Sequence, residues 1–122
     1  MHEVSVMSSI VEQVLEELKR HSVDRVEEVV LEVGELTFLG HEQLEFAFEI
    51  MVRDTPLEGA ELRIVEEKLE VSCPSCGYRG KVDYFEEHHF SVPVLSCPEC
   101  GERVEVLKGR KCGVTSLRVV EA

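Results

Sequence analysis

The 122-residue sequence predicts an α+β protein in which two helices pack on a three-stranded sheet and a zinc-ribbon lobe is inserted before the last strand. Two segments repeat apolar residues at helical spacing, and three others alternate apolar and polar residues, as half-buried strands do. Two C-x-x-C pairs separate the second of these strands from the third. Two amphipathic helices on one face of a sheet would bury both apolar stripes in a two-layer domain.

The first helix is predicted over residues 6–18, where apolar residues recur every three or four positions and an S-x-x-E capping box begins at Ser9. The first strand is predicted over residues 26–36, which alternate and are rich in valine. The same alternation in residues 60–71 and 114–120 predicts the second and third strands.

A second helix is predicted between the break at Gly40 and a point near Arg53, before the Thr55-Pro56 pair. Four apolar residues at helical spacing form its predicted inner face: Leu44, Ala47, Phe48 and Met51. Three more are expected to widen that face: Phe46, Ile50 and Val52. This helix is therefore expected to be more buried than the first.

The distribution of large apolar residues along the chain predicts two structural units. Residues 1–70 together with 112–122 contain the predicted helices and strands and would form an α/β body. Residues 71–111 contain few large apolar side chains. A piece of about 40 residues with so small a core usually needs a metal or disulfides to fold. We therefore expect residues 71–111 to be a zinc-ribbon domain.

A C-P-x-C-G motif occurs twice, at Cys73 and Cys76 and again at Cys97 and Cys100, with twenty residues between the pairs. Two intervening residues let both sulfurs of a tight turn face one ion. Four thiolates then form a closed tetrahedral site for structural zinc, with no position open for catalysis. The alternatives are iron, which would make a redox protein, and two disulfides. The fifth cysteine, Cys112, is expected to be a small buried thiol at the start of the last strand.

The net charge of −12 argues against nucleic acid as the main partner, because binding to phosphate backbones depends on Lys and Arg. No apolar run approaches the roughly 18 residues that cross a bilayer, and the first residues lack the features of a secretion signal. We therefore expect a cytoplasmic protein that binds neither nucleic acid nor membrane. The sequence contains no nucleophile motif, phosphate-binding loop or dinucleotide fingerprint, so no enzymatic activity is predicted.

A histidine at position 2 offers a specific metal chemistry. The Met1 amine, the His2 amide nitrogen and the His2 imidazole Nδ1 would chelate one Ni(II) or Cu(II) ion in a plane and leave a fourth position open. His88 and His89, between the cysteine pairs, are candidates for that position. The plain alternative is an ordinary exposed chain end and a solvated loop. The remaining histidines are expected at the ends of helices: His21 and His41.

Three motifs in order link the chain to a known family. Met1-His2-Glu3 opens the sequence, Val33-Gly34-Glu35-Leu36 follows the first strand, and the paired C-x-x-C motifs precede the last strand. Together they resemble the HypA/HybF family, nickel metallochaperones for the maturation of [NiFe]-hydrogenases. The resemblance covers essentially the whole chain, and the combination is far more specific than any single motif.

The resemblance implies that nickel binds through Met1 and His2, with Glu3 near the site, and that zinc is held by the four paired cysteines. It also implies two partners, a HypB-type GTPase and the precursor of the hydrogenase large subunit; some bacterial relatives also serve urease. Certain archaeal members add a nickel-binding histidine from a His-Phe-x-Pro-like segment, to which residues 89–93 are similar with one extra residue. Gly40 stands where some bacterial members have an aspartate near the nickel.

The alternative function is a zinc-ribbon module for protein interaction or nucleic-acid binding without a nickel role. The paired cysteine motifs alone fit that function equally well. The acidic composition disfavours nucleic acid, and the Met1-His2 end favours nickel, because a ribbon module has no need of it.

Overall fold

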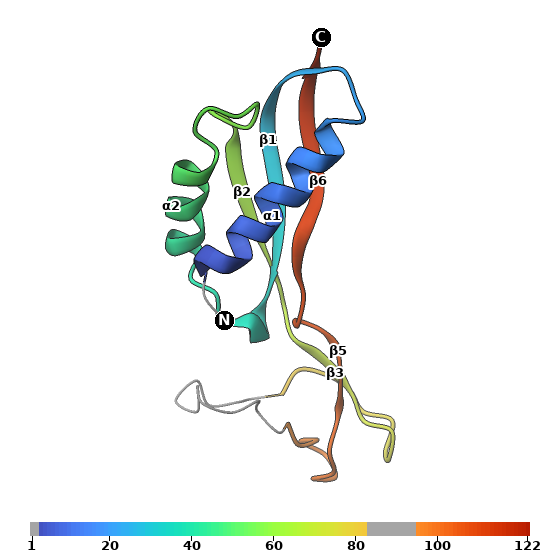
Figure 1. The fold of residues 1–122 in the computed structure, drawn as a ribbon. Helices are drawn as coiled ribbons and strands as arrows, with labels where there is room; N and C mark the ends of the chain where they lie inside the picture. The colour runs from blue at the N-terminus through green and yellow to red at the C-terminus, as the bar shows by residue number, and fades with distance from the viewer. Residues whose placement is uncertain (1–2, 83–94) are drawn as a thin grey trace.

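The computed structural model describes residues 3–82 and 95–122 (Figure 1). The elements of its body are helix α1 (Glu3–Leu18), strand β1 (Val23–Gly34), helix α2 (His41–Met51), strand β2 (Glu61–Glu67) and strand β6 (Cys112–Glu121). The sheet has the order β2-β1-β6, with β1 parallel to β2 and antiparallel to β6. The predicted fold class is confirmed, as is the order of its helices and strands.

Both helices pack against this sheet around one hydrophobic core. Figure 1 shows α1 crossing in front of β1 and β6, while α2 runs beside β2. The parallel β1-α2-β2 unit explains this arrangement, because a crossover helix between parallel neighbouring strands packs on one face of their sheet. Neither helix has the length and apolar character that a membrane span requires in the described part of the chain.

The predicted inner face of α1 is confirmed by five buried residues: Met7, Ile10, Val11, Val14 and Leu18. The helix begins at Glu3, however, so the predicted capping box is wrong, because Ser9 lies two turns inside the helix. The Oε2 atom of Glu3 instead accepts a hydrogen bond of 2.9 Å from the amide of Gly40, the residue that precedes α2. This contact joins the starts of the two helices.

On α2, the predicted inner face is confirmed for Leu44, Ala47 and Phe48, while Met51 is half-buried. Phe46 and Ile50 do not widen that face, because their side chains are 65% and 45% exposed. A rotation of 100° per residue places position 46 about 200° from position 44, on the outer side of the helix. The expectation that α2 is more buried than α1 is therefore wrong, since α2 buries three residues and α1 buries five.

A second, smaller sheet consists of β3 (Glu70–Ser72), β4 (Arg79–Gly80) and β5 (Glu105–Lys108), in the order β4-β3-β5. The predicted strand over residues 60–71 is thus two strands, β2 in the body and β3 in this lobe. The lobe has its own apolar cluster, which consists of Leu69, Val71, Cys73, Val82, Leu95, Cys97 and Val104. So small a cluster indicates that the lobe needs a further source of stability.

The two sheets meet where residues 34–36 cross the segment 109–111. The amide of Gly34 donates to the carbonyl of Lys111 (2.8 Å), and the amide of Leu36 donates to the carbonyl of Gly109 (2.7 Å). Two carboxylates complete this junction: Glu35 Oε1 accepts from the amide of Leu69 (2.8 Å), and Glu67 Oε1 accepts from the amide of Gly109 (2.7 Å). The lobe is therefore joined to the body by hydrogen bonds as well as by the chain.

The carboxylates at the junction also influence one another. The hydrogen bond from the Gly109 amide lowers the pKa of Glu67, because it stabilises the charged carboxylate. A hydrogen bond with Glu67, followed by partial desolvation and charge repulsion, raises the pKa of the neighbouring Glu32. As pH rises, Glu67 therefore loses its proton before Glu32 does.

Candidate metal centre

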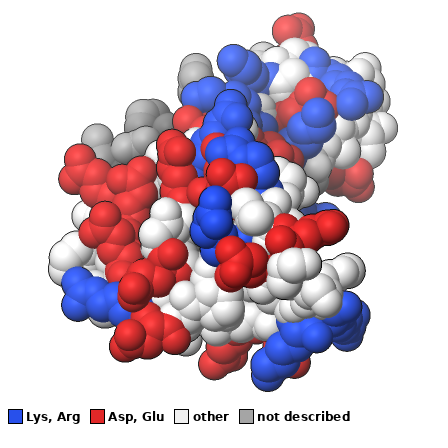
Figure 2. All heavy atoms as spheres, turned by 90° about the horizontal axis from the view of Figure 1, so that it is seen from above, with Lys and Arg blue, Asp and Glu red and all other residues white. Residues whose placement is uncertain are grey.

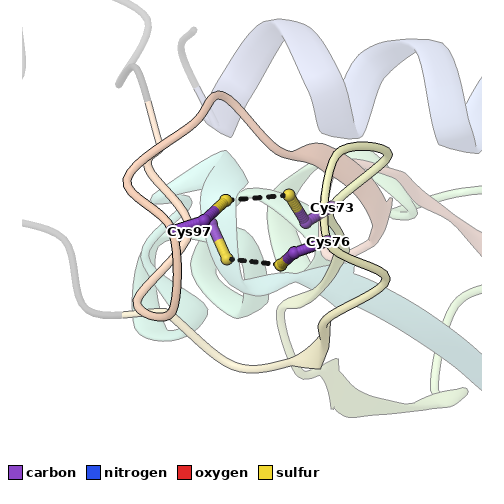
Figure 3. A group of neighbouring side chains, drawn as sticks. Cys73, Cys76 and Cys97 are labelled. Carbon is purple, nitrogen blue, oxygen red and sulfur yellow. Dashed lines mark hydrogen bonds between the residues drawn. The ribbon is translucent and has the colours of Figure 1, made fainter.

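Four cysteine sulfurs gather in the lobe (Figure 3). The Sγ atoms of Cys73 and Cys100 are 3.5 Å apart, those of Cys76 and Cys97 are 3.6 Å apart, and all four lie within 4.8 Å of one another. A zinc ion with Zn–S bonds of about 2.3 Å would have sulfurs about 3.8 Å apart at the corners of a tetrahedron. The arrangement fits that tetrahedron, and none of the four cysteines forms a disulfide.

The two C-P-x-C-G motifs fold into the same turn. The carbonyl of Cys73 accepts a hydrogen bond from the amide of Gly77, and the carbonyl of Cys97 accepts one from the amide of Gly101, each at 2.9 Å. Both glycines have a φ near +80°, which favours glycine over residues with a side chain. The repeated motif therefore produces two equivalent turns, each of which buries its first cysteine and exposes its second.

Backbone amides point toward the sulfurs. A hydrogen bond from the amide of Cys76 lowers the pKa of Cys73 to about 7. The amide of Glu102 likewise acts to lower the pKa of Cys100, but burial and hydrogen bonds with the other thiols raise it to about 12. Four sulfurs this close disfavour four negative charges unless a cation lies between them, and a divalent ion removes the thiol protons on binding. The donor set thus fits structural zinc, whose closed four-sulfur shell leaves no position for a substrate.

Of the other candidate ligands, Met1, His2, His88 and His89 lie outside the described residues. Glu3 is described, and its carboxylate is engaged by the amide of Gly40. The four cysteines are the only group that could hold a metal ion within residues 3–82 and 95–122.

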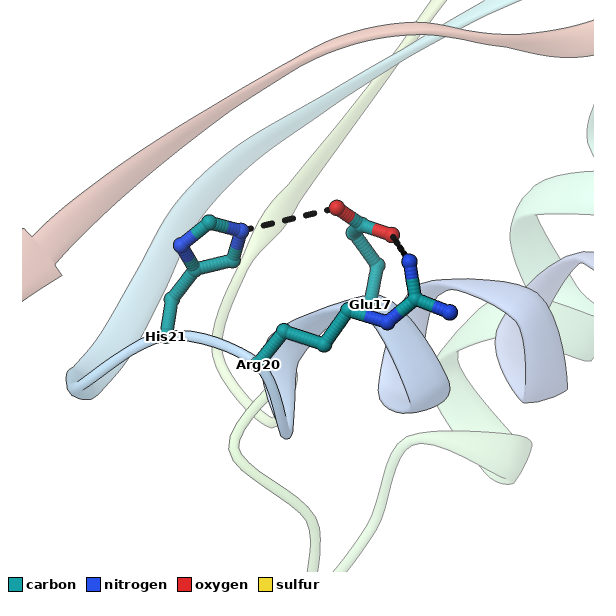
Figure 4. Close-up of polar contacts among 3 residues, drawn as sticks. All are labelled: Glu17, Arg20 and His21. Atoms are coloured by element: carbon teal, nitrogen blue, oxygen red, sulfur yellow. Dashed lines mark hydrogen bonds and ion pairs between the residues drawn. The ribbon is translucent and has the colours of Figure 1, made fainter.

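The two described histidines lie at helix ends, as expected. His21 follows α1, and its Nε2 atom is 3.5 Å from Glu17 Oε1 while Arg20 approaches the other carboxylate oxygen of Glu17 at 3.7 Å (Figure 4). These side chains are mostly exposed, so the contacts contribute little to stability. His41 opens α2 and is exposed. Cys112 is the first residue of β6 and lies half-buried against the body core. Burial raises the pKa of its thiol, so the thiol stays protonated.

A two-layer α/β body with a closed four-cysteine site in a separate small sheet defines a small zinc-ribbon metalloprotein. A family model described as "Hydrogenase/urease nickel incorporation, metallochaperone, hypA" matches residues 1–119. The chain therefore belongs to the HypA family of nickel metallochaperones. That family consists of metallochaperones rather than enzymes, which agrees with the absence of catalytic motifs in the sequence.

Individual relatives agree with the family match. The hydrogenase maturation factor HypA of Methanothermobacter thermautotrophicus is 38% identical over 120 residues, which cover 98% of this chain and 97% of that protein. The corresponding factor of Methanopyrus kandleri is 34% identical over 135 residues, which cover 98% of this chain and 93% of that protein. The solution structure of the Ni metallochaperone HypA from Helicobacter pylori is 26% identical, covers both chains completely and superimposes with a TM-score of 0.67. Membership in this family supports a nickel role over the alternatives of a ribbon module and an iron protein.

Proposed function

We propose that this metallochaperone binds Ni(II) through the Met1 amine, the His2 amide nitrogen and the His2 imidazole, and delivers the ion to the precursor of a [NiFe]-hydrogenase large subunit. The family match carries this proposal, because it begins at residue 1 and thus includes the Met1-His2 pair. Three nitrogen donors in a plane suit Ni(II) and leave one position open. An open position suits a protein that must pass its metal on.

The first described turn of α1 supports the proposal, because Glu3 directly follows His2 in the sequence. The hydrogen bond from the Gly40 amide to Glu3 and the full burial of Met7 hold the first turns of α1 against the body. Glu3 would therefore act next to the nickel site as a positioning residue, because it fixes the first turn of α1, to which His2 is joined. His88 or His89 of the zinc lobe supplies the fourth ligand.

The zinc centre has a structural role in this proposal. Cys73, Cys76, Cys97 and Cys100 would hold the ion, which supplies the folding energy that the small lobe core lacks. Two separate sheets and two separate apolar clusters support a division into two units. The proposed units are a nickel-binding body, residues 1–70 and 112–122, and a zinc-ribbon domain, residues 71–111, although Leu69 and Glu70 already belong to the lobe cluster and the lobe sheet.

The partners in this proposal are a HypB-type GTPase and the hydrogenase precursor, all in the cytoplasm. Nickel release would follow protonation of a ligand histidine or rearrangement against a partner.

Single histidine variants test the assignment of the nickel ligands. In zinc-loaded protein with its native amino terminus, His2→Ala is expected to weaken nickel binding at least about 100-fold, because the imidazole donor is lost and only the amine and amide nitrogens remain in the chelate. The matched controls are His21→Ala and His41→Ala, which remove exposed histidines at helix ends and should leave the affinity within about twofold. Equal nickel affinity in all three variants would contradict the proposed site.

A further inference from the structure

Three large apolar residues are exposed on the outer sides of α1 and α2. Val4 is 61% exposed, Phe46 is 65% exposed and Ile50 is 45% exposed. Val4 and Phe46 line one open hollow, whose rim includes Glu3 and Glu42. Ile50 lies one turn beyond Phe46 on the same face of α2, because residues four apart in a helix share a face. We call Val4, Phe46 and Ile50 the helix patch.

The fold does not require the helix patch. The inner face of α2 is supplied by Leu44, Ala47 and Phe48, and that of α1 by other residues. Single exposed apolar residues are ordinary on protein surfaces, but a contiguous group beside charged residues is typical of an interaction site. Exposed apolar residues that the core does not use break the usual pattern of polar surface and apolar interior. Such exceptions are expected at functional sites.

The charge around the helix patch has one sign. Glu3 and Glu42 line the hollow, and Glu45 and Glu49 are exposed next to Phe46 and Ile50 on α2, a helix that contains no lysine or arginine. Figure 2 shows acidic side chains gathered along the side of the molecule on which Figure 1 places α2. Two copies of the chain docked through this face would bring like charges together, which disfavours self-association.

We propose that the helix patch is the docking surface for a basic amphipathic segment of the GTPase partner. Apolar side chains of that segment would fill the hollow between Val4 and Phe46, and its Lys and Arg residues would meet the surrounding glutamates. This inference rests on the proposed function, which names the GTPase as a partner. Apolar anchors give such an interface its affinity, and the complementary charges raise the association rate and select the partner.

The position of the helix patch gives it a functional consequence. Val4 follows His2 by two residues in the chain, and Glu3 lies on the rim of the same hollow. A protein docked on the patch is therefore adjacent to the proposed nickel ligands, so the ion would cross a short distance between the two proteins.

The test compares two lysine substitutions at equally exposed apolar positions. Ile50 is 45% exposed within the patch, and Leu107 is 46% exposed on β5 of the zinc lobe. Affinity for the purified HypB-type GTPase from the same genome is measured by calorimetry for the wild type, Ile50→Lys and Leu107→Lys. We expect Ile50→Lys to weaken binding at least about tenfold and Leu107→Lys to change it less than about twofold. Wild-type binding should also weaken as salt rises, since the contacts at the rim are ionic.

A nickel titration of the same variants separates this inference from the proposed function. Both variants are expected to bind nickel as the wild type does, because neither position is a proposed ligand. If both variants bind the GTPase equally well, the docking surface is refuted while the nickel site stands. If the wild type does not bind the GTPase, the proposed partner and the proposed occupant of the patch both fail. If instead Ile50→Lys abolishes a dimer of the wild type, the occupant is a second copy and the proposal is wrong.

Discussion

Because the backbone crosses closely at Gly34 and Gly109, we predict that Gly34→Ala lowers the free energy of unfolding substantially, although it adds only one methyl group. A Cβ atom added at Gly34 would lie 2.9 Å from the Arg110 nitrogen and closer still to the Gly109 carbonyl group. These are backbone atoms, so no side chain can rotate away to make room. The matched control is Gly113→Ala on β6, where an added Cβ atom meets nothing within 4 Å.

The size of the effect follows from what must move. To restore ordinary contact distances, the crossing must open by about 1 Å. That movement strains the bonds from Gly34 to Lys111 and from Leu36 to Gly109, each contributing roughly 0.5–1.5 kcal/mol. Together with overpacking, the expected loss for Gly34→Ala is about 1–3 kcal/mol, or roughly 4 °C in Tm per kcal/mol for a chain of this size. Gly113→Ala should be neutral or stabilise by up to about 1 kcal/mol.

The assay is urea unfolding of both zinc-loaded variants, followed by circular dichroism. The free energy of unfolding is read from the midpoint, provided that the slope is unchanged. Equal stability of Gly34→Ala and Gly113→Ala would refute the tight crossing between lobe and body.

Two further predictions concern the zinc centre and the junction. Cys97→Ser is expected to abolish stoichiometric zinc binding and expose the remaining lobe cysteines to alkylation, whereas Cys112→Ser should retain one zinc, as measured by metal analysis. Glu32→Gln is expected to raise the unfolding midpoint at pH 7. Its folded pKa is raised above the usual 4.5, so its charge opposes folding at neutral pH; the gain should vanish below about pH 4.5, where Glu32 is protonated in both states. Glu61→Gln, on the exposed start of β2, is the control and should show no such pH-dependent gain.

The sequence predicts the body well because its signals are local. The spacing of apolar residues in α1 and the alternation in β1 show which face of each segment is buried. This pattern is present in the segment itself, whichever other elements of the chain pack against it. The division of residues 60–71 is a different case, because the alternation changes phase there. Leu62 and Ile64 lie at even positions and pack against the body core, whereas Leu69 and Val71 lie at odd positions and pack in the lobe cluster. Reading the segment as one strand overlooked this change of phase.

The outer face of α2 and the junction were missed for different reasons. Phe46 and Ile50 were assigned to the core from their apolar character, although their offset from Leu44 already placed them opposite the buried face. Gly34 and Gly109 are far apart in the sequence, and no periodic signal shows that two glycines will cross.

The zinc site was the most predictable part of the metal chemistry. A repeated C-P-x-C-G motif specifies both the turn and the direction of its sulfurs, so the four cysteines were expected together and the structure brings them within 4.8 Å. The nickel site depends on Met1, His2, His88 and His89, which lie outside the described residues, and its ligands remain a prediction from the motif and the family.

A nickel titration tests the central claim most directly. Zinc-loaded protein with its native amino terminus is titrated by calorimetry and visible absorbance, and compared with the same chain carrying a long amino-terminal tag, which removes the free Met1 amine. The native chain is expected to bind one Ni(II) with square-planar absorption, and the tagged chain is expected to lose that site. Equal binding in both chains, or none in either, would contradict nickel capture by Met1 and His2.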